Sequence, residues 1–363
     1  METTAMEVTS GRYISGENVC EELGKELRLL SVKKVYLLGG ARALEAVLPR
    51  IEAGLAEEGI EWMAGHFEGY CTYEKAGFHA ERLRASGCGG VVGIGGGRCI
   101  DTAKAAAEMT GVPLGSIPTQ AATCVSCTNM AILYKESGAY IGPLYPKRPI
   151  AFTLADFGVL RRAPVRYIAS GIADALAKYP ELKFSQRGTF DCQAVDDAAL
   201  QASYRLSEAT WNTLLANGRQ AYADNRRETV THPFTAAVNT NLVTTGVISG
   251  LARGSRQQAM AHAVYNSSTV LFPEAWRAYL HGEIVSVGVV LQQRFNRAPE
   301  EELDQYVSLA RDLGVPVCLE DLGIRGTGEE LDRLCKALLE RFREFTPEDG
   351  KRLRGELERI VKR

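Results

Sequence analysis

The sequence predicts an α/β N-terminal half followed by an all-helical C-terminal half. Short apolar runs that suit strands alternate with helical periodicity up to about Phe152, and such runs almost disappear beyond it. A chain of 363 residues is long enough to form two domains that each bury a core. We therefore expect an α/β domain over residues 1–155 and a helical domain over residues 156–363, with the boundary between Pro149 and Ala163.

Repeated strand–turn–helix units make up the first half. The run Lys34–Leu38 is short, apolar and followed by two glycines, as expected of a buried parallel strand. The segment after it carries Leu44, Val47 and Ile51 at helical spacing. Repeats of this kind favour a parallel sheet with right-handed connections. The elements expected here are strands over residues 34–38, 90–94 and 112–117 and helices over residues 43–58, 74–85 and 102–110.

The second half shows helical spacing of its apolar residues almost throughout. No convincing internal repeat or low-complexity segment interrupts it. The helices expected here cover residues 166–184, 196–217, 233–251, 255–270, 281–295, 300–313 and 328–345.

Composition excludes several classes of function. The chain has 42 basic and 44 acidic residues and a net charge of -2, so no basic excess is present to bind a nucleic-acid backbone. No stretch approaches the ~18 apolar residues of a membrane helix, and Met1–Tyr13 lacks the features of a secretory signal. Nine scattered cysteines, an odd number, indicate reduced thiols and a cytoplasmic location. Cys124 and Cys127 form a CxxC pair, but no second pair stands at zinc-finger spacing.

A glycine turn, Gly95-Gly96-Gly97-Arg98, joins the strand expected over residues 90–94 to the helix after it. Glycines at such a junction let backbone N–H groups approach a phosphate, and the helix N-terminus adds a favourable positive potential. Asp101 is expected in the first turn of this helix, where a carboxylate suits the helix dipole. A glycine run alone is compatible with a plain tight turn, but the strand-to-helix context favours phosphate binding.

The strand over residues 34–38 runs into Gly39-Gly40-Ala41-Arg42. Nucleotide folds that prefer NAD often carry an acidic residue at the corresponding position, where it holds the ribose hydroxyls. This chain has no carboxylate there, and Arg42 stands close by. NADP is therefore a candidate cofactor beside NAD, with Arg42 either meeting the 2′-phosphate or simply solvated.

Three residues far apart in the chain, Asp174, His262 and His281, are candidate ligands of one divalent metal. Each stands near small residues in a segment with helical spacing, and the two histidines fall in neighbouring segments separated by Pro273. Two imidazoles and one carboxylate suit Zn²⁺, and also Fe²⁺, and leave a coordination position open for a substrate. The alternatives are that the histidines are hydrogen-bonded core residues and that Asp174 caps or bridges helices.

Five ordered stretches resemble the iron-containing alcohol dehydrogenase superfamily, and specifically its glycerol dehydrogenase branch. They span most of the chain, from about residue 30 to about residue 325. The stretches are GIGGGRCIDTAKA (93–105), IPTQAATCVSCTNMAILY (117–134), ASGIADALAKYPE (169–181), AHAVYN (261–266) and LHGEIVSVG (280–288). The resemblance implies a dinucleotide-binding N-terminal domain and an all-α C-terminal domain, the dehydroquinate synthase-like fold.

The resemblance also implies roles for individual residues. The metal ligands would be Asp174, His262 and His281, with zinc expected before iron. The pyrophosphate would lie on the glycine turn at Gly96, Gly97 and Arg98, Thr119 and Thr123 would line the cofactor site, and Thr128, Met130 and Tyr134 would lie near the nicotinamide.

The chain departs from the glycerol dehydrogenase pattern at four places. Cys124 stands where an acid that touches substrate is usual, and Gly39 or Gly40 stands where the ribose-binding acid is usual. Tyr265 replaces the second histidine of the AHAxHN segment, and Lys178 replaces a further histidine ligand of the iron enzymes. The first two departures put glycerol and strict NAD preference in doubt, and the last indicates three protein ligands.

Cys124 and Lys178 also resemble the hydroxycarboxylate dehydrogenase branch of the superfamily. The absence of a carboxylate lifts a repulsion against an anionic substrate. Lys178 lies four residues after Asp174 and so projects from the same helix face. It is placed either to meet a substrate carboxylate beside the metal or to remain solvated or salt-bridged, and both roles stay open.

The expected reaction is hydride transfer between a nicotinamide and a small polyol or 2-hydroxy acid, with the metal acting as a Lewis acid. A 2-hydroxy acid is favoured over glycerol. The alternatives are a lyase related to dehydroquinate synthase, whose acid and lysine pattern after the glycine turn is missing, and a non-catalytic relative that binds nucleotide or metal. A homo-oligomer is expected because related enzymes bury apolar helical surface between subunits.

Overall fold

The computed structural model describes residues 8–184, 198–252, 259–342 and 344–362. The chain divides into two compact units, one formed by residues 1–164 with 225–230 and the other by residues 165–224 with 231–363. Cys192 and residues 196–197, 255–258 and 343 of the expected helices lie outside the described residues. Each unit is described by itself.

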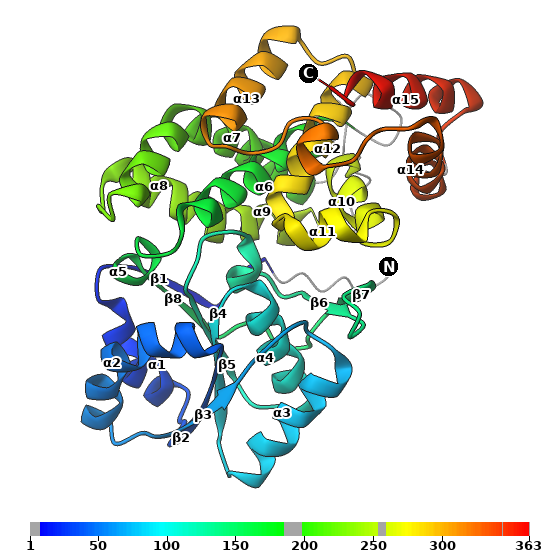
Figure 1. The fold of residues 1–363 in the computed structure, drawn as a ribbon. Coiled ribbons are helices and arrows are strands. Elements are labelled where there is room, and N and C mark those ends of the chain that lie inside the picture. Colours follow the sequence, from blue (N-terminus) through cyan, green and yellow to red (C-terminus); the bar gives the residue numbers. More distant parts are fainter. Residues whose placement is uncertain (1–7, 185–197, 253–258, 343, 363) are drawn as a thin grey trace. The chain divides into compact units, whose positions relative to one another are not determined.

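The first unit contains a parallel sheet of six strands in the order β1-β8-β5-β4-β2-β3 (Figure 1). Pairing in register places Ile94 beside Gly39 and Pro118 beside Gly95, so the carboxyl ends of β2, β4 and β5 meet at one edge. A separate antiparallel hairpin is formed by β6 and β7. The strands are β1 (Arg12–Gly16), β2 (Lys34–Gly39), β3 (Glu61–His66), β4 (Gly90–Gly95), β5 (Leu114–Pro118), β6 (Ala131–Tyr134), β7 (Tyr140–Leu144) and β8 (Phe152–Asp156).

Helices cover both faces of this sheet. Alternate residues of a strand point to opposite faces, and in β2 Val35 and Leu37 pack in one core cluster while Tyr36 and Leu38 pack in another. The first cluster includes residues of α1 and α2, and the second includes residues of α3 and α4, as Figure 1 shows. A strand buried on both faces explains the unbroken apolar run in the sequence. The helices are α1 (Leu23–Leu29), α2 (Ala41–Glu57), α3 (Tyr73–Ala85), α4 (Gly97–Thr110) and the short α5 (Phe157–Leu160).

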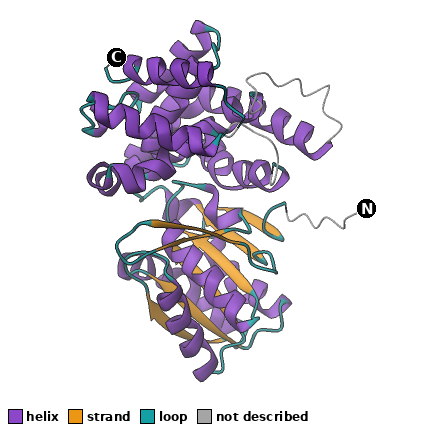
Figure 2. Cartoon of the chain, turned by 90° about the vertical axis from the view of Figure 1, so that its right-hand side faces the viewer, coloured by secondary structure: helices purple, strands orange, loops and turns teal. Residues whose placement is uncertain are grey.

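All the regular elements in the described residues of the second unit are helices, joined by loops (Figure 2). Its centre is α12, which is buried along most of its length and packs against α6 and α10. A π-helical turn, Thr240–Thr244, joins two of the helices. The helices are α6 (Val165–Lys183), α7 (Ala198–Arg226), α8 (His232–Asn239), α9 (Thr245–Leu251), α10 (Met260–Leu271), α11 (Pro273–Ala278), α12 (His281–Phe295), α13 (Glu300–Asp312), α14 (Gly328–Arg341) and α15 (Pro347–Arg359).

The expected fold class is confirmed, but several element boundaries were wrong. The helix expected from Thr102 begins at Gly97, because the preceding Gly96 has extended backbone and serves as its N-cap. The helix expected over residues 233–251 is divided by the π-helical turn, and the helix expected to reach Phe345 ends at Arg341. None of the described helices has the length and apolarity needed to cross a bilayer. The eight cysteines among the described residues are free thiols.

The buried His79 of α3 makes the stability of the first unit depend on pH. The Tyr36 hydroxyl lies 3.0 Å from His79 Nδ1. Burial, and then the charge of Arg82, lower the pKa of His79 from 6.5 to about 4. The unfolded chain therefore takes up this proton near pH 6.5 and the folded chain only near pH 4, so stability is full above pH 6.5 and falls as pH drops toward 4.

We expect His79→Asn, which keeps a polar atom near the Tyr36 hydroxyl but cannot titrate, to flatten this dependence. Between pH 7.5 and 4.5 the wild-type chain should lose about 2–3 kcal/mol more stability than the variant. Thermal unfolding followed by circular dichroism at both pH values measures the difference. Equal losses in the two proteins would exclude His79 as the source.

Candidate functional sites: a three-ligand cluster and a glycine turn

Asp174, His262 and His281 lie together in the second unit, on α6, α10 and α12 respectively. One ligand atom from each lies within 4.8 Å of the others. Asp174 Oδ1 is 3.2 Å from His262 Nε2 and 3.4 Å from His281 Nε2. The carboxylate is buried, whereas both imidazoles keep part of their surface exposed. The sequence expectation that these three residues face one point therefore holds in the fold.

The spacing of these atoms fits one divalent metal. Bonds of 2.0–2.1 Å in a tetrahedral arrangement separate neighbouring ligand atoms by about 3.4 Å. The two distances from Asp174 Oδ1, 3.2 and 3.4 Å, are close to that value. Two imidazoles and a carboxylate are ligands that Zn²⁺ and Fe²⁺ both accept. Among the described residues, this is the one group of three such side chains close enough to hold an ion.

The first turn of α12 brings His281 to Asp174 because it packs directly on α6. A Cβ at Gly282 would lie 1.9 Å from the Ser170 carbonyl oxygen, so only glycine permits this approach. The Gly282 N–H also donates to Ser170 Oγ at 3.1 Å. Ser170 and Asp174 are one helical turn apart on α6, and therefore the residue before Gly282 faces Asp174.

An ion pair fixes the same end of α12. Glu283 accepts hydrogen bonds of 2.6 Å from both Arg166 Nε and Nη2, and it also accepts one of 2.7 Å from the Leu280 N–H. A bidentate pair of this kind restricts orientation as well as adding energy. Arg166 and Glu283 therefore hold the start of α12, where His281 is the first helical residue.

The glycine turn lies in the first unit, at the carboxyl end of β4. Gly95 has φ +150°, a backbone conformation that other residues rarely adopt, and Gly96 precedes the first turn of α4. Gly95, Gly96, Gly97 and Thr123 line a small pocket. The Thr119 N–H donates to the Gly95 carbonyl at 3.1 Å and ties the segment after β5 to the turn. The N-terminus of α4 therefore opens onto this pocket, as phosphate binding requires.

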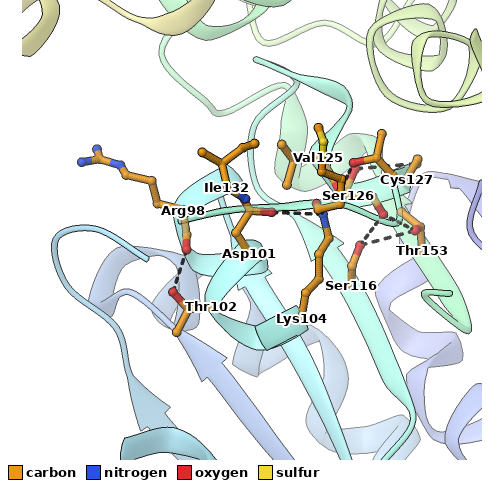
Figure 3. Close-up of polar contacts among 12 residues, drawn as sticks. Arg98, Asp101, Thr102, Lys104, Ser116, Val125, Ser126, Cys127, Ile132 and Thr153 are labelled. Carbon is orange, nitrogen blue, oxygen red and sulfur yellow. Dashed lines mark hydrogen bonds and ion pairs between the residues drawn. The ribbon is translucent and has the colours of Figure 1, made fainter. Parts of the chain in front are cut away.

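Asp101 does not stand where the sequence suggested. It is the fifth residue of α4 rather than part of its first turn, and its side chain is buried. Asp101 Oδ1 lies 3.1 Å from Lys104 Nζ, and Oδ2 accepts from the Ile132 N–H at 3.0 Å (Figure 3). Lys104 Nζ also donates to the Met130 carbonyl. This buried pair attaches the start of β6 to α4, and the Asp101 carboxylate has internal partners instead of facing the turn.

Cys124 begins a short 3-10 turn, η2 (Cys124–Cys127), directly after Thr123, and its side chain is buried. The hydroxyls of Ser116 and Thr153 both donate to the Ser126 carbonyl, at 3.0 and 2.7 Å, and hold η2 on β5 and β8 (Figure 3).

Thr128 follows η2 and is buried, with its hydroxyl donating to the Val125 carbonyl at 3.4 Å. Tyr134 ends β6 and packs its ring against Tyr70 and Tyr140. Arg98, beside the turn, places its guanidinium 5.1 Å from the Tyr70 ring. Thr128 and Tyr134 thus belong to the segment around η2 and β6 that the sequence assigned to the cofactor, and the binding roles of Arg98, Thr128 and Tyr134 remain predictions.

Comparison with known proteins places these features in a family. The family model described as iron-containing alcohol dehydrogenase matches residues 10–151. Glycerol dehydrogenase from Escherichia coli O6:H1 is 31% identical over 319 residues, which are 87% of this chain and 84% of that protein. The chain belongs to the iron-containing alcohol dehydrogenase family. As a member of this family it is an oxidoreductase, as the sequence analysis expected.

Two further comparisons concern one relative by sequence and one solved structure. Hydroxycarboxylate dehydrogenase A from Escherichia coli K12 is 29% identical over 238 residues, 64% of this chain and 63% of that protein. The crystal structure of a probable glycerol dehydrogenase from Sinorhizobium meliloti 1021 matches with a TM-score of 0.83 at 22% identity, over 99% of this chain and 98% of that one. The second likeness is one of fold. Family membership implies NAD(H) and a divalent metal as cofactors.

The charged groups around Asp174, His262 and His281 favour the binding of a cation. Burial alone would raise the pKa of Asp174, but His281, His262 and Lys178 hold the pKa of this carboxyl well below its usual range. Burial alone would lower the pKa of His262, but the carboxylates of Glu181 and Asp174 raise it to about 9. The carboxylates thus favour a positive charge at this cluster. Without a metal His262 carries that charge as a protonated imidazole, and a bound metal would replace its proton.

Tyr265, one of the departures from the family pattern, lies against a candidate ligand. Its ring meets the His281 ring edge-on with centroids 4.1 Å apart, and its hydroxyl accepts from Trp276 Nε1 at 3.1 Å. Tyr265 therefore packs beside His281 in the place where the resemblance expected a second histidine.

Lys178 and Glu181 extend the site along α6. Lys178 Nζ lies 3.4 Å from His262 Nε2, so the lysine is beside the candidate ligands rather than in open solvent. Glu181, which the sequence reasoning did not single out, lies 2.8 and 2.9 Å from His262 Nδ1 through its two oxygens. The sequence did contain an indication of Glu181, because residues 174, 178 and 181 are spaced four and three apart and so share one helix face.

Proposed function

We propose that this family member is a metal-dependent, NAD(P)-linked oxidoreductase whose substrate is a small 2-hydroxy acid or the corresponding 2-oxoacid. The observation that carries the proposal is the position of Lys178, whose ammonium group lies 3.4 Å from the candidate ligand atom His262 Nε2. A 2-hydroxy acid has its reacting oxygen and its carboxylate on adjacent carbons. A cation beside the metal site is therefore suited to the carboxylate of such a substrate.

One sequence feature and one relative support an anionic substrate over glycerol. The resemblance places Cys124 where glycerol dehydrogenases usually have an acid that touches substrate, and a thiol does not repel a carboxylate as an acid would. A relative of this chain is named hydroxycarboxylate dehydrogenase A. Glycerol oxidation is the second candidate, because glycerol dehydrogenase from Escherichia coli O6:H1 matches over more of the chain.

Each residue of the two candidate sites has a proposed role. Asp174, His262 and His281 would hold the metal, zinc being favoured because Lys178 replaces a fourth protein ligand. When bound, the metal supplies a Lewis acid at the substrate oxygen, and the nicotinamide supplies or accepts the hydride. Lys178 orients the substrate carboxylate. The backbone N–H groups at Gly96 and Gly97 would hold the pyrophosphate at the start of α4.

Replacement of Lys178 tests the substrate class. We expect Lys178→Met, which keeps side-chain length without charge, to raise KM for 2-oxoacids by about 10- to 100-fold, because a charge-assisted hydrogen bond contributes about 1.5–3 kcal/mol. The KM for dihydroxyacetone should change by less than about twofold. NADH and NADPH oxidation at 340 nm by zinc-reconstituted protein, with a chelator control, measures both.

Lys183→Met is the matched control, since Lys183 lies on the same helix but pairs with Glu302 at 2.6 Å. This control variant should retain the wild-type KM for both substrates. Two outcomes would contradict the proposal and favour glycerol oxidation. One is a wild-type preference for dihydroxyacetone, and the other is an equal loss of activity with both substrates in Lys178→Met.

The cofactor preference is proposed to include NADP(H). Gly40 is the N-cap of α2 at the carboxyl end of β2, and Arg42 is exposed in the first turn of that helix. An acid at such a position holds ribose hydroxyls, whereas its absence beside an arginine accommodates a 2′-phosphate. The helix N-terminus adds to the attraction for that phosphate.

Gly40→Asp should shift the preference toward NAD(H). A Cβ at Gly40 would meet only the Phe67 carbonyl oxygen, at 3.6 Å, and aspartate is a favourable N-cap, so the fold should tolerate the change. We expect the ratio of kcat/KM for NADH over NADPH to rise at least about tenfold, equivalent to about 1.4 kcal/mol. Arg42→Ala should weaken NADPH alone. An unchanged ratio in both variants would contradict this assignment.

A further inference from the structure

Glu181 stands directly behind one of the candidate metal ligands. It is buried on α6, and both of its oxygens lie within 2.9 Å of His262 Nδ1, on the side of the ring away from Asp174. Glu181 Oε1 also accepts from the His262 backbone N–H at 3.0 Å. One carboxylate therefore engages both the ring and the main chain of the same residue.

An ionised carboxylate can only accept hydrogen bonds, so the proton between Glu181 and His262 must be carried by Nδ1. A neutral imidazole with its proton on Nδ1 presents a lone pair at Nε2. Nε2 is the atom that lies 3.2 Å from Asp174 Oδ1. Without an ion it can carry a second proton toward that carboxylate, and a bound ion would take the place of that proton. Lys178 Nζ, an obligate donor 3.4 Å from Nε2, is compatible with the same tautomer.

The backbone around this contact is held by a third helix. Gln292 of α12 donates through Nε2 to the Pro180 carbonyl at 2.9 Å and accepts through Oε1 from the Ala261 N–H at 3.2 Å. These are the residues immediately before Glu181 and His262. Gln292 is fully buried, so its amide connects α6 to α10 at the point where the carboxylate meets the imidazole.

We propose that Glu181 is a positioning residue that fixes the tautomer and orientation of His262 for metal binding. The inference rests on the proposed metal site and adds a residue outside the three ligands. A carboxylate hydrogen-bonded to the far nitrogen of a ligating histidine raises the basicity of that ligand, and loss of such a partner typically weakens metal binding 10- to 100-fold. Glu181 thereby acts through His262 and touches neither substrate nor cofactor.

Two variants of matched volume separate the charge of Glu181 from its hydrogen bond. Glu181→Gln keeps one acceptor oxygen for Nδ1 but removes the charge, and Glu181→Met removes both. Zinc binding by the full-length protein is measured by competition with a chelator. We expect the zinc Kd to rise about tenfold in Glu181→Gln and about 100-fold in Glu181→Met. Spectra of the zinc-loaded, ¹⁵N-histidine-labelled protein should show a protonated Nδ1 for His262 in wild type, and a weaker Nδ1–H hydrogen bond in Glu181→Met.

Glu302→Gln serves as the control, because it removes a carboxylate of the same unit that pairs with Lys183 away from the cluster. Its zinc Kd should equal that of wild type. Zinc affinities of both Glu181 variants within about twofold of wild type would overturn the positioning role while leaving the metal site intact. If Glu181→Met fails to fold, the zinc Kd of Glu181→Gln alone tests the positioning role. A wild-type protein that binds no zinc would overturn the metal site and this inference together.

Discussion

The candidate metal site depends on the contact between the first turn of α12 and the backbone of α6. Gly282 lies against the Ser170 carbonyl so closely that any side chain at position 282 would push the helices apart. That approach sets the 3.4 Å distance between His281 Nε2 and Asp174 Oδ1. The Arg166–Glu283 pair and the Ser170 hydroxyl reinforce the contact from both sides. Helix packing thus brings the three candidate ligands together.

Much of the first unit could be predicted because its signals are local. The strands at Lys34–Gly39 and Gly90–Gly95 are apolar runs that precede glycines, and burial on both faces of the sheet produces that pattern. β1 and β3 were not predicted, since both are edge strands with partly exposed, mixed sequences. β1 is defined by pairing with β8, about 140 residues away, which no local pattern reports. The π-helical turn at Thr240–Thr244 was also missed, because its side chains keep helical spacing.

The three candidate ligands could be identified from the sequence, but the residues around them could not. Asp174, His262 and His281 were identified by residue type and by resemblance, and the fold brings them together. Glu181 escaped because its partner is 81 residues away, and a glutamate at the end of a helix is usually a solvated residue. Asp101 was assigned to the helix dipole because the start of α4 was placed five residues too late. Both errors concern contacts whose partners only the tertiary structure specifies.

The charges of the second unit explain why so polar a cluster can be largely buried. Two carboxylates, Asp174 and Glu181, have negligible access to solvent, and each is hydrogen-bonded to an imidazole. Burial of an unpaired carboxylate would cost several kcal/mol, whereas a paired and hydrogen-bonded one is tolerated. Lys178 adds a compensating cation on the same helix face. The arrangement is therefore stable without an ion yet still favours one.

X-ray absorption at the zinc edge of the reconstituted wild-type protein tests the central claim most directly, namely that Asp174, His262 and His281 hold the metal. Zinc held by these three residues should show a nearest shell of nitrogen and oxygen at about 2.0–2.1 Å, outer scattering from two imidazole rings, and no sulfur. A sulfur shell at about 2.3 Å would assign the ion to cysteines such as Cys124 and Cys127 and would contradict the account.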